Sequence, residues 1–162
     1  ADQSSRSCPP PPPPPSASAL SAPQLPAAAT EASPSGRGAD DVIVQYLVVR
    51  KDLTKKPLKW SWGSVISNAC HASVSAITSG LADEDSVVAD YVSPENKTQM
   101  HKVTLAVPGE EELVKTSKAL DEAKISHCLW VEEPEKIPTC LAARPMARKK
   151  IKPHLQHLKL FR

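Results

Sequence analysis

An almost uninterrupted run of β-forming, apolar residues, Val42–Val49, constrains the fold of this chain more than any other feature. Gln45 is the clearest polar interruption, and the run ends at the charged residues 50–52. A strand without regular polar alternation is typical of a central strand that is buried on both faces. The sequence therefore predicts a sheet with this segment near its centre.

Further strand patterns follow along the chain, and helical patterns separate them. The additional strand candidates are residues 102–107, 127–131 and 137–143. The helix candidates are residues 62–81, 83–92, 110–120 and 146–158, the last of them basic and interrupted near Pro153. Strands separated by helices indicate a layered α/β fold.

The helix expected over residues 62–81 has two different faces. Its large apolar residues recur at three- and four-residue spacing, which predicts that they face the sheet: Ile66, Cys70, Val74, Ile77 and Leu81. Polar residues gather on the opposite side of the helix: Ser64, Ser67, Asn68, His71 and Ser75. We therefore expect Val74 and Ile77 in the core and His71 on a polar surface.

Residues 1–40 have a different composition, with the proline run Pro9–Pro15 and few large apolar side chains. Such a segment predicts a disordered tail with local polyproline II structure, followed by one folded domain over residues 41–162. A solvated leader is the favoured interpretation, and a ligand for a protein that binds proline-rich segments is the alternative. The acids Asp2, Glu31 and Asp40 argue against an organelle transit peptide, so we expect a cytoplasmic protein, with organelle targeting by the tail as the open alternative.

The four cysteines show neither the spacing of a metal site nor that of a disulfide framework. They are Cys8, Cys70, Cys128 and Cys140. We expect reduced, buried thiols, no bound metal and a reducing compartment. Because the chain also lacks an apolar run of bilayer length, we expect no membrane segment.

The net charge of +2 conceals a strongly basic C-terminal segment. Residues 144–162 contain no Asp or Glu, and their cations include Arg144, Arg148, Lys149 and Lys150. This charge density predicts binding to the phosphates of an RNA backbone, with the lysines of residues 51–59 as further candidates. A solvated helix is the alternative.

Short motifs in a fixed order extend over residues 42–162. They are Gln45–Leu53 with its Arg-x-Asp-Leu ending, Asn68-Ala-Cys-His-Ala72, Thr139–Pro145 and the closing Leu158–Phe161. Together they resemble the type II peptidyl-tRNA hydrolase family, and especially its divergent peptidyl-tRNA hydrolase domain-containing branch. The resemblance implies a single α/β domain of three α/β/α layers with a mixed four-stranded sheet, and tRNA as the partner.

The resemblance also implies a catalytic group. Glu132 best matches the family's aspartate after the third strand, with Glu133 as the alternative, and would serve as a base or orient the attacking water. Thr139 and a nearby backbone N–H would stabilise the oxyanion, and His71 would relay a proton. A Ser64–His71 or Ser67–His71 nucleophile pair is rejected because no third member is evident.

The same motifs imply contacts to the substrate by Arg50, Lys51, Asp52, Ser64 and Asn68. Ser64 stands where the family places a lysine, so a catalytic or phosphate-binding cation is replaced, and Lys51 is a candidate substitute.

The sequence thus favours hydrolysis of the ester in peptidyl- or aminoacyl-tRNA without a cofactor. A non-catalytic RNA- or protein-binding module of the same fold is the rival, and Ser64 is its main support. Trp60 and Trp62 either stack on the unpaired tRNA end or attach the first helix to the core. The sequence leaves open whether the protein is a monomer or a dimer.

Overall fold

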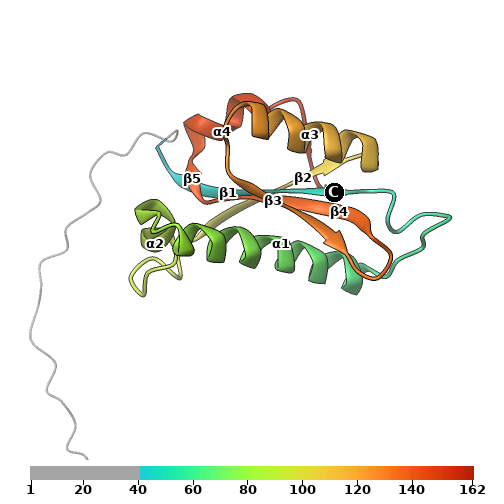
Figure 1. Ribbon diagram of the computed structural model, residues 1–162, viewed down its shortest axis with the longest axis horizontal. Coiled ribbons are helices and arrows are strands. Elements are labelled where there is room, and N and C mark those ends of the chain that lie inside the picture. The colour runs from blue at the N-terminus through green and yellow to red at the C-terminus, as the bar shows by residue number, and fades with distance from the viewer. Residues whose placement is uncertain (1–40) are drawn as a thin grey trace, which may run out of the picture. The chain divides into compact units, whose positions relative to one another are not determined.

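The computed structural model describes residues 41–162, and the expectations for the proline-rich tail lie outside this range. Strands and helices alternate along the chain as a layered α/β fold requires (Figure 1). The elements are β1 (Ile43–Arg50), α1 (Trp62–Ala82), α2 (Ser86–Tyr91), β2 (His101–Val107), α3 (Glu110–Glu122), β3 (His127–Glu132), β4 (Ile137–Ala143), β5 (Met146–Ala147), α4 (Arg148–Leu155) and β6 (Lys159–Leu160).

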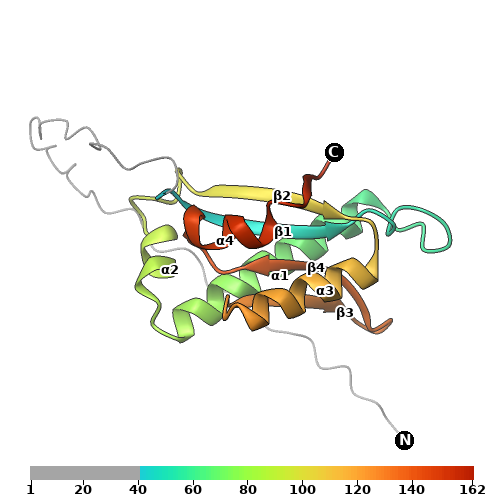
Figure 2. The ribbon, with the colours of Figure 1, turned by 90° about the horizontal axis from the view of Figure 1, so that it is seen from above.

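The sheet is mixed, as expected, but it has six strands instead of four. Its order is β3-β4-β1-β2-β6, and β5 pairs with β1 beside β4. Figure 2 shows β2, β1, β4 and β3 side by side. Strands β1 and β2 are parallel, and the other pairs are antiparallel. The sequence missed β5 and β6 because two-residue strands are too short to show an alternating pattern.

Helices cover both faces of the sheet, so the predicted three-layer arrangement is correct (Figure 1). Strand β1 is central and buried along nearly its whole length, as its apolar run predicted. Its side chains alternate between two cores: Leu47 and Val49 pack on the α1 side, whereas Tyr46 and Val48 belong to the core with α3 and α4.

The buried face of α1 differs from the prediction. Val74 is 58% exposed and Ile66 is 60% exposed, and Leu81 and Cys70 are also exposed. The inward face is instead formed by mostly small residues, which are Val65, Asn68, Ala72, Ser73, Ala76 and Gly80. The expectation was wrong because α1 lies close to its neighbours, where small side chains fit and large ones do not.

Gly80 illustrates this close packing where α1 meets α2. A Cβ atom on this residue would lie 2.7 Å from Cγ2 of Val88. Val88 is fully buried in α2. Asp85 caps α2 by accepting hydrogen bonds from the N–H groups of Val87 and Val88, so the short helix is held against the end of α1.

Candidate functional site

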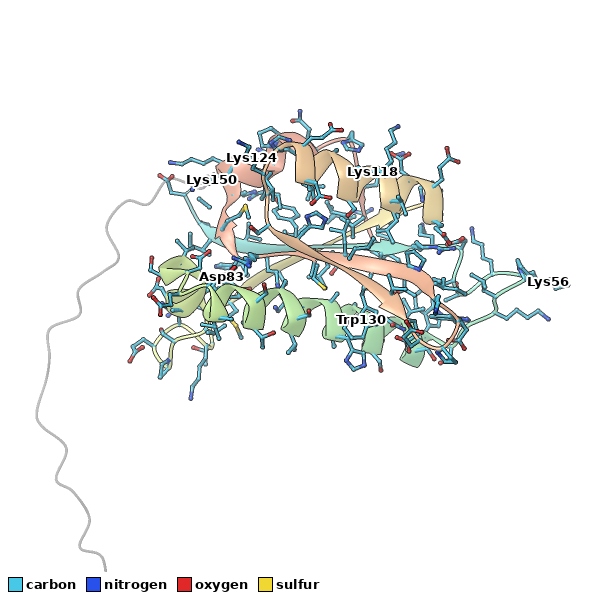
Figure 3. All side chains as sticks on the ribbon, in the orientation of Figure 1. Lys56, Asp83, Lys118, Lys124, Trp130 and Lys150 are labelled. Carbon is cyan, nitrogen blue, oxygen red and sulfur yellow. The ribbon has the colours of Figure 1, made fainter. Side chains whose placement is uncertain are left out.

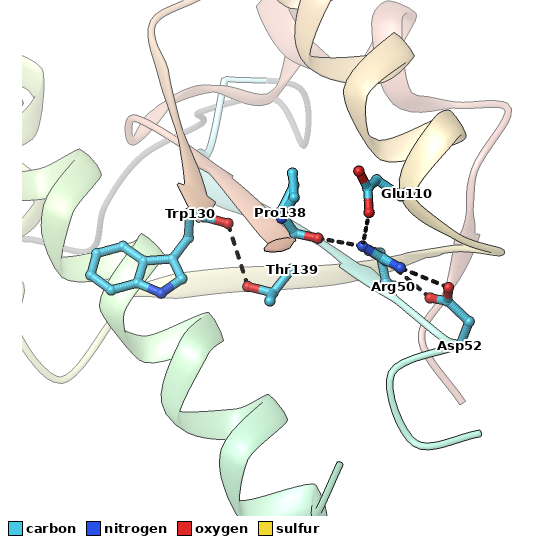
Figure 4. Close-up of polar contacts among 6 residues, drawn as sticks. All are labelled: Arg50, Asp52, Glu110, Trp130, Pro138 and Thr139. Atoms are coloured by element: carbon cyan, nitrogen blue, oxygen red, sulfur yellow. Dashed lines mark hydrogen bonds and ion pairs between the residues drawn. The ribbon is translucent and has the colours of Figure 1, made fainter. Parts of the chain in front are cut away.

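The three predicted catalytic side chains meet around Trp130 of β3. The Trp130 ring stacks on His71 of α1, with 4.9 Å between the ring centroids and 20° between the ring planes. Its indole Nε1 donates a hydrogen bond of 2.9 Å to Glu132. Its carbonyl oxygen accepts a hydrogen bond of 3.4 Å from Thr139 (Figure 4). Sequence reasoning missed Trp130, whose place inside an apolar strand gave no sign that it joins the other three residues.

These side chains differ in their access to solvent. Glu132 is half-buried, and within residues 41–162 only the Trp130 indole bonds its carboxylate. Thr139 is 0% exposed, and its hydroxyl also donates to Sγ of Cys140 at 3.6 Å. In this arrangement water reaches Glu132, whereas the threonine is closed off from solvent.

Ser64 and Asn68 lie on the adjacent first turns of α1. Ser64 is exposed, its N–H donates to the side chain of the N-cap residue Ser61, and the two hydroxyls are 2.9 Å apart. Asn68 is only 2% exposed, so its assignment to an exposed polar face was wrong. Its Nδ2 donates to the Ser64 carbonyl at 2.9 Å, but its buried Oδ1 has no partner within the described residues. An unpaired buried acceptor is costly, so this atom lowers the stability of the packing beneath α1.

Arg50 and Asp52 form an internal clamp, although both were expected to contact substrate. Arg50 is 5% exposed and donates two hydrogen bonds of 3.0 and 2.8 Å to Asp52. It also donates to Glu110 at 2.8 Å and to the Pro138 carbonyl at 2.6 Å (Figure 4). One guanidinium thereby joins the end of β1 to α3 and β4, which favours a structural role over a phosphate contact.

Electrostatics reinforce this clamp. The hydrogen bonds from Arg50 lower the pKa of Asp52 from its ordinary value of 3.8, and the hydrogen bond to Asp52 is the main cause of a raised pKa for Arg50. A Cβ atom at Gly109 would lie 3.3 Å from Oδ2 of Asp52. The start of α3 therefore lies close against the charged pair.

The basic C-terminal segment lies apart from the Trp130 group. Arg144 pairs with Asp83 and donates to Ser79 at 2.8 Å, near the C-terminal end of α1. Arg148, Lys149 and Lys150 belong to α4, on the opposite face of the sheet from α1 (Figure 1). Figure 3 shows Lys150 and Trp130 on opposite sides of the domain. The structure therefore does not bring these cations to the predicted catalytic residues.

A second set of cations precedes α1 in the chain. The loop between β1 and α1 carries four exposed lysines, which are Lys51, Lys55, Lys56 and Lys59. Figure 3 shows Lys56 at the far right of the domain, beyond Trp130. Buried Leu53 anchors the loop, and its carbonyl accepts a hydrogen bond of 2.8 Å from the Trp60 N–H. The loop thus offers positive charge beside the start of α1, where the family lysine is replaced by Ser64.

The tryptophans of this region have different environments. Trp60 is partly buried and packs on the core beneath α1, as expected for a residue that attaches the helix. Trp62 is 56% exposed and contacts the Phe161 ring edge-on, with 5.9 Å between the centroids.

The cysteines only partly match the expectation of buried thiols. Cys140 is fully buried, and burial raises its pKa to about 12. Cys128 is half-buried and donates to the Ser75 hydroxyl at 3.2 Å. Cys70 is exposed, because the large apolar residues of α1 with which it was grouped do not face the core.

Residues 41–162 contain no cluster of histidine, cysteine or carboxylate side chains suited to hold a metal ion. Their helices also include none with the length and hydropathy of a membrane span.

Comparison with known proteins agrees with this organisation. The family model described as "Peptidyl-tRNA hydrolase PTH2" matches residues 43–161. The chain is 36% identical over 121 residues to "Putative peptidyl-tRNA hydrolase PTRHD1" of Homo sapiens, an alignment that covers 75% of this chain and 84% of the human protein. The Mus musculus protein of the same name is also 36% identical, with the same coverage.

A solved structure of a protein of unknown function from Agrobacterium tumefaciens is 14% identical, with a TM-score of 0.47. It covers 74% of this chain and 98% of its own chain, and the score is too low to support any argument. The family match rests on nearly the whole of the described domain and on the two mammalian relatives. This chain therefore belongs to the peptidyl-tRNA hydrolase PTH2 family.

Proposed function

We propose that this protein hydrolyses the ester bond of peptidyl- or aminoacyl-tRNA and releases free tRNA. The observation that carries the proposal is the contact of Trp130 with His71, Glu132 and Thr139, which gathers an acid, a hydroxyl and an imidazole at one end of the sheet. Family membership supports tRNA as the partner. Three free thiols among the described residues accord with action in the cytoplasm.

Glu132 is the proposed base. The Trp130 indole holds one carboxylate oxygen, Oε2, and leaves Oε1 free to accept a proton from an attacking water. Attack on the ester carbonyl forms a tetrahedral oxyanion, and its collapse releases the peptide as an acid and the terminal ribose hydroxyl with a returned proton. His71 is the candidate to carry that proton, because its imidazole lies beside the indole that donates to Glu132; a water would have to bridge the carboxylate and the imidazole, since the stacked ring offers no path for a proton.

Thr139 is the proposed donor to the oxyanion, and because this residue is fully buried the role requires a local opening around the start of β4 when substrate binds. We further propose that the lysines of the β1–α1 loop, rather than those of α4, neutralise the phosphates next to the ester.

A non-catalytic tRNA-binding module is the second candidate. Two observations favour it: the covered Thr139 hydroxyl and the absence of a lysine at position 64. In this case the loop lysines would still bind the acceptor backbone, but no group would be positioned for the oxyanion.

A single series of variants separates the two functions. Purified full-length protein is incubated in excess with peptidyl-tRNA at low salt, and intact substrate is followed with time while binding is measured separately. Hydrolysis that Glu132→Gln abolishes, with RNA binding retained, supports the enzyme, and Ser64→Lys should then accelerate turnover. Bound tRNA that stays intact with both wild type and Ser64→Lys overturns hydrolysis and leaves the binding module.

Two matched triple variants test the proposal that the loop lysines bind the phosphates. The triple reversal of Lys55, Lys56 and Lys59 to glutamate should weaken tRNA binding and flatten its salt dependence. The triple reversal of Arg148, Lys149 and Lys150 should have the smaller effect. The opposite ranking would return phosphate binding to α4, as the charge density of the sequence alone suggested.

A further inference from the structure

A second surface feature lies on the other flank of α1 and takes no part in the proposed hydrolysis. It is a groove of about 290 Å³ between α1, the neighbouring strands β1 and β2, and the C-terminal segment. Leu47 and Val49 of β1 line it, together with Ile66 of α1 and Phe161. Its surface is almost entirely apolar, and its volume is close to the lower end of the range for small-molecule pockets.

Lys102 gives this groove a single charge. It is the only lining residue with a charged side chain of the Lys, Arg, Asp or Glu type. Its ammonium donates to Oγ of Ser73 at 2.9 Å and to the side chain of Gln45, both neutral acceptors. Within residues 41–162, no carboxylate lies within ion-pair distance of it.

The Lys102 ammonium lies near an aromatic ring and is partly withdrawn from water. The Tyr91 ring lies 5.7 Å from the ammonium. Desolvation lowers the pKa of Lys102, even though part of its side chain remains exposed. A positive charge that is partly removed from water and lacks a counter-ion gains most from an anion brought by a ligand.

The opposite end of the groove is apolar and aromatic. Trp62 and Phe161 meet edge-on there, and Ile66 beside them is 60% exposed. Each is a large surface whose burial by an apolar ligand would be favourable. Because α1 rises by a fixed distance per residue, the stretch from Trp62 at this end to Ser73 beside the cation is about 16 Å long.

We propose that the groove binds a single-chain aliphatic carboxylate, with its head at Lys102 and its tail along α1 toward Trp62 and Phe161. One ammonium matches the single negative charge of a carboxylate, whereas a phosphate dianion would need more donors than the groove offers. The narrow volume favours one chain over a two-chain lipid.

Decanoate is the test ligand, used below its aggregation concentration with the full chain and followed by calorimetry and by amide chemical shifts. We expect saturable binding that shifts the amides of residues 62–73 and 102–104. Decanol, which has the same tail but no charge, should bind at least about tenfold more weakly, as the loss of one charged hydrogen bond predicts. Equal affinity for the two ligands would overturn the proposal.

Two variants and one control locate the ligand. Lys102→Met should weaken decanoate about tenfold and leave decanol unchanged, and a matched melting temperature shows that the variant is folded. Ile66→Asp places a negative charge on an exposed part of the groove, where it should abolish binding without disturbing the core. Lys118→Met, an exposed lysine of α3 on the other face of the sheet, should change nothing.

A second copy of the chain is the competing occupant of this groove. Sedimentation of the wild type and of Ile66→Asp tests it directly. A wild-type dimer that the substitution converts to a monomer, with no decanoate bound by either, would assign the groove to self-association and overturn the ligand. Decanoate affinity that survives both groove substitutions would show that the acid binds elsewhere.

Discussion

The two flanks of α1 each carry a tryptophan and a charged side chain, but these are paired with neighbours on one flank and more open to solvent on the other. On the flank toward β3, Trp130 stacks on His71 and donates to Glu132, so ring, imidazole and carboxylate all have partners. On the flank toward β2, Trp62 is 56% exposed and Lys102 has no carboxylate beside it within the described residues.

The sheet explains the difference. The closed flank, which holds the Trp130 group, faces the six- and seven-residue strands β3 and β4. The open flank, which holds the groove, faces β2, beyond which the sheet continues only through the two-residue strand β6. The long strands β3 and β4 cover the side chains on the first flank. Beyond β2 the sheet is short, so the side chains of the groove stay accessible to a ligand.

The rates of thiol alkylation should differ most, between exposed Cys70 beside the groove and buried Cys140 in the core. Cys70 is exposed beside the groove, whereas Cys140 is buried, and burial raises its pKa to about 12, so that very little of it is thiolate at pH 8. Alkylation by iodoacetamide, followed by peptide mass spectrometry, should modify Cys140 much more slowly than Cys70, because Cys140 is both buried and mostly protonated. Comparable rates would mean that the core beneath the closed flank opens readily.

Removal of the two tryptophans should affect stability very unequally. Trp130→Ala deletes a half-buried ring together with its contacts to His71 and Glu132, and should lower the free energy of unfolding by about 3 kcal/mol. Trp62→Ala removes a mostly exposed ring and should cost less than about 1 kcal/mol. Urea denaturation measures both, and equal losses would remove the distinction between a closed and an open flank.

Two substitutions in α1 test which of its faces is buried. Ala76→Leu inserts a large side chain where the helix packs closely, and overpacking should cost about 1–3 kcal/mol. Val74→Ala changes an exposed position and should lie within about 0.5 kcal/mol of wild type. A large loss of stability in Val74→Ala would mean that the large apolar residues of α1, and not the small ones, face the core.

The Arg50 clamp lies outside both flanks, and breaking its ion pair should have only a small effect on stability. Because Arg50 lowers the pKa of Asp52, the carboxylate contributes stability above its ordinary pKa of 3.8, and this contribution is lost as the pH falls through the lowered value. Asp52→Asn should therefore cost less than about 1 kcal/mol at pH 7, since the pair is partly screened by solvent.

Thermal unfolding of wild type and Asp52→Asn at several pH values checks this sign. The difference between the two proteins should shrink below pH 4 and stay constant near neutrality. A difference that grows in acid would contradict the assignment of the ionised Asp52 as the stabilising form.

The sequence by itself determined the central strand and the family. The apolar run of β1 required burial on both faces, and the motifs over residues 42–162 depend only on local order along the chain. Glu132, Thr139 and His71 were named from the same motif positions, and their catalytic roles stay predictions.

Tertiary structure alone decided which surfaces these residues share. Hydrophobicity placed Val74 inward, but the close approach of α1 selects small residues such as Ala72 and Ala76. Charge density pointed to α4, but the chain crosses to the other face of the sheet before that helix begins (Figure 1). Trp130 and Lys102 gave no signal because their roles come from partners on other strands and helices, and a linear pattern carries no information about such contacts.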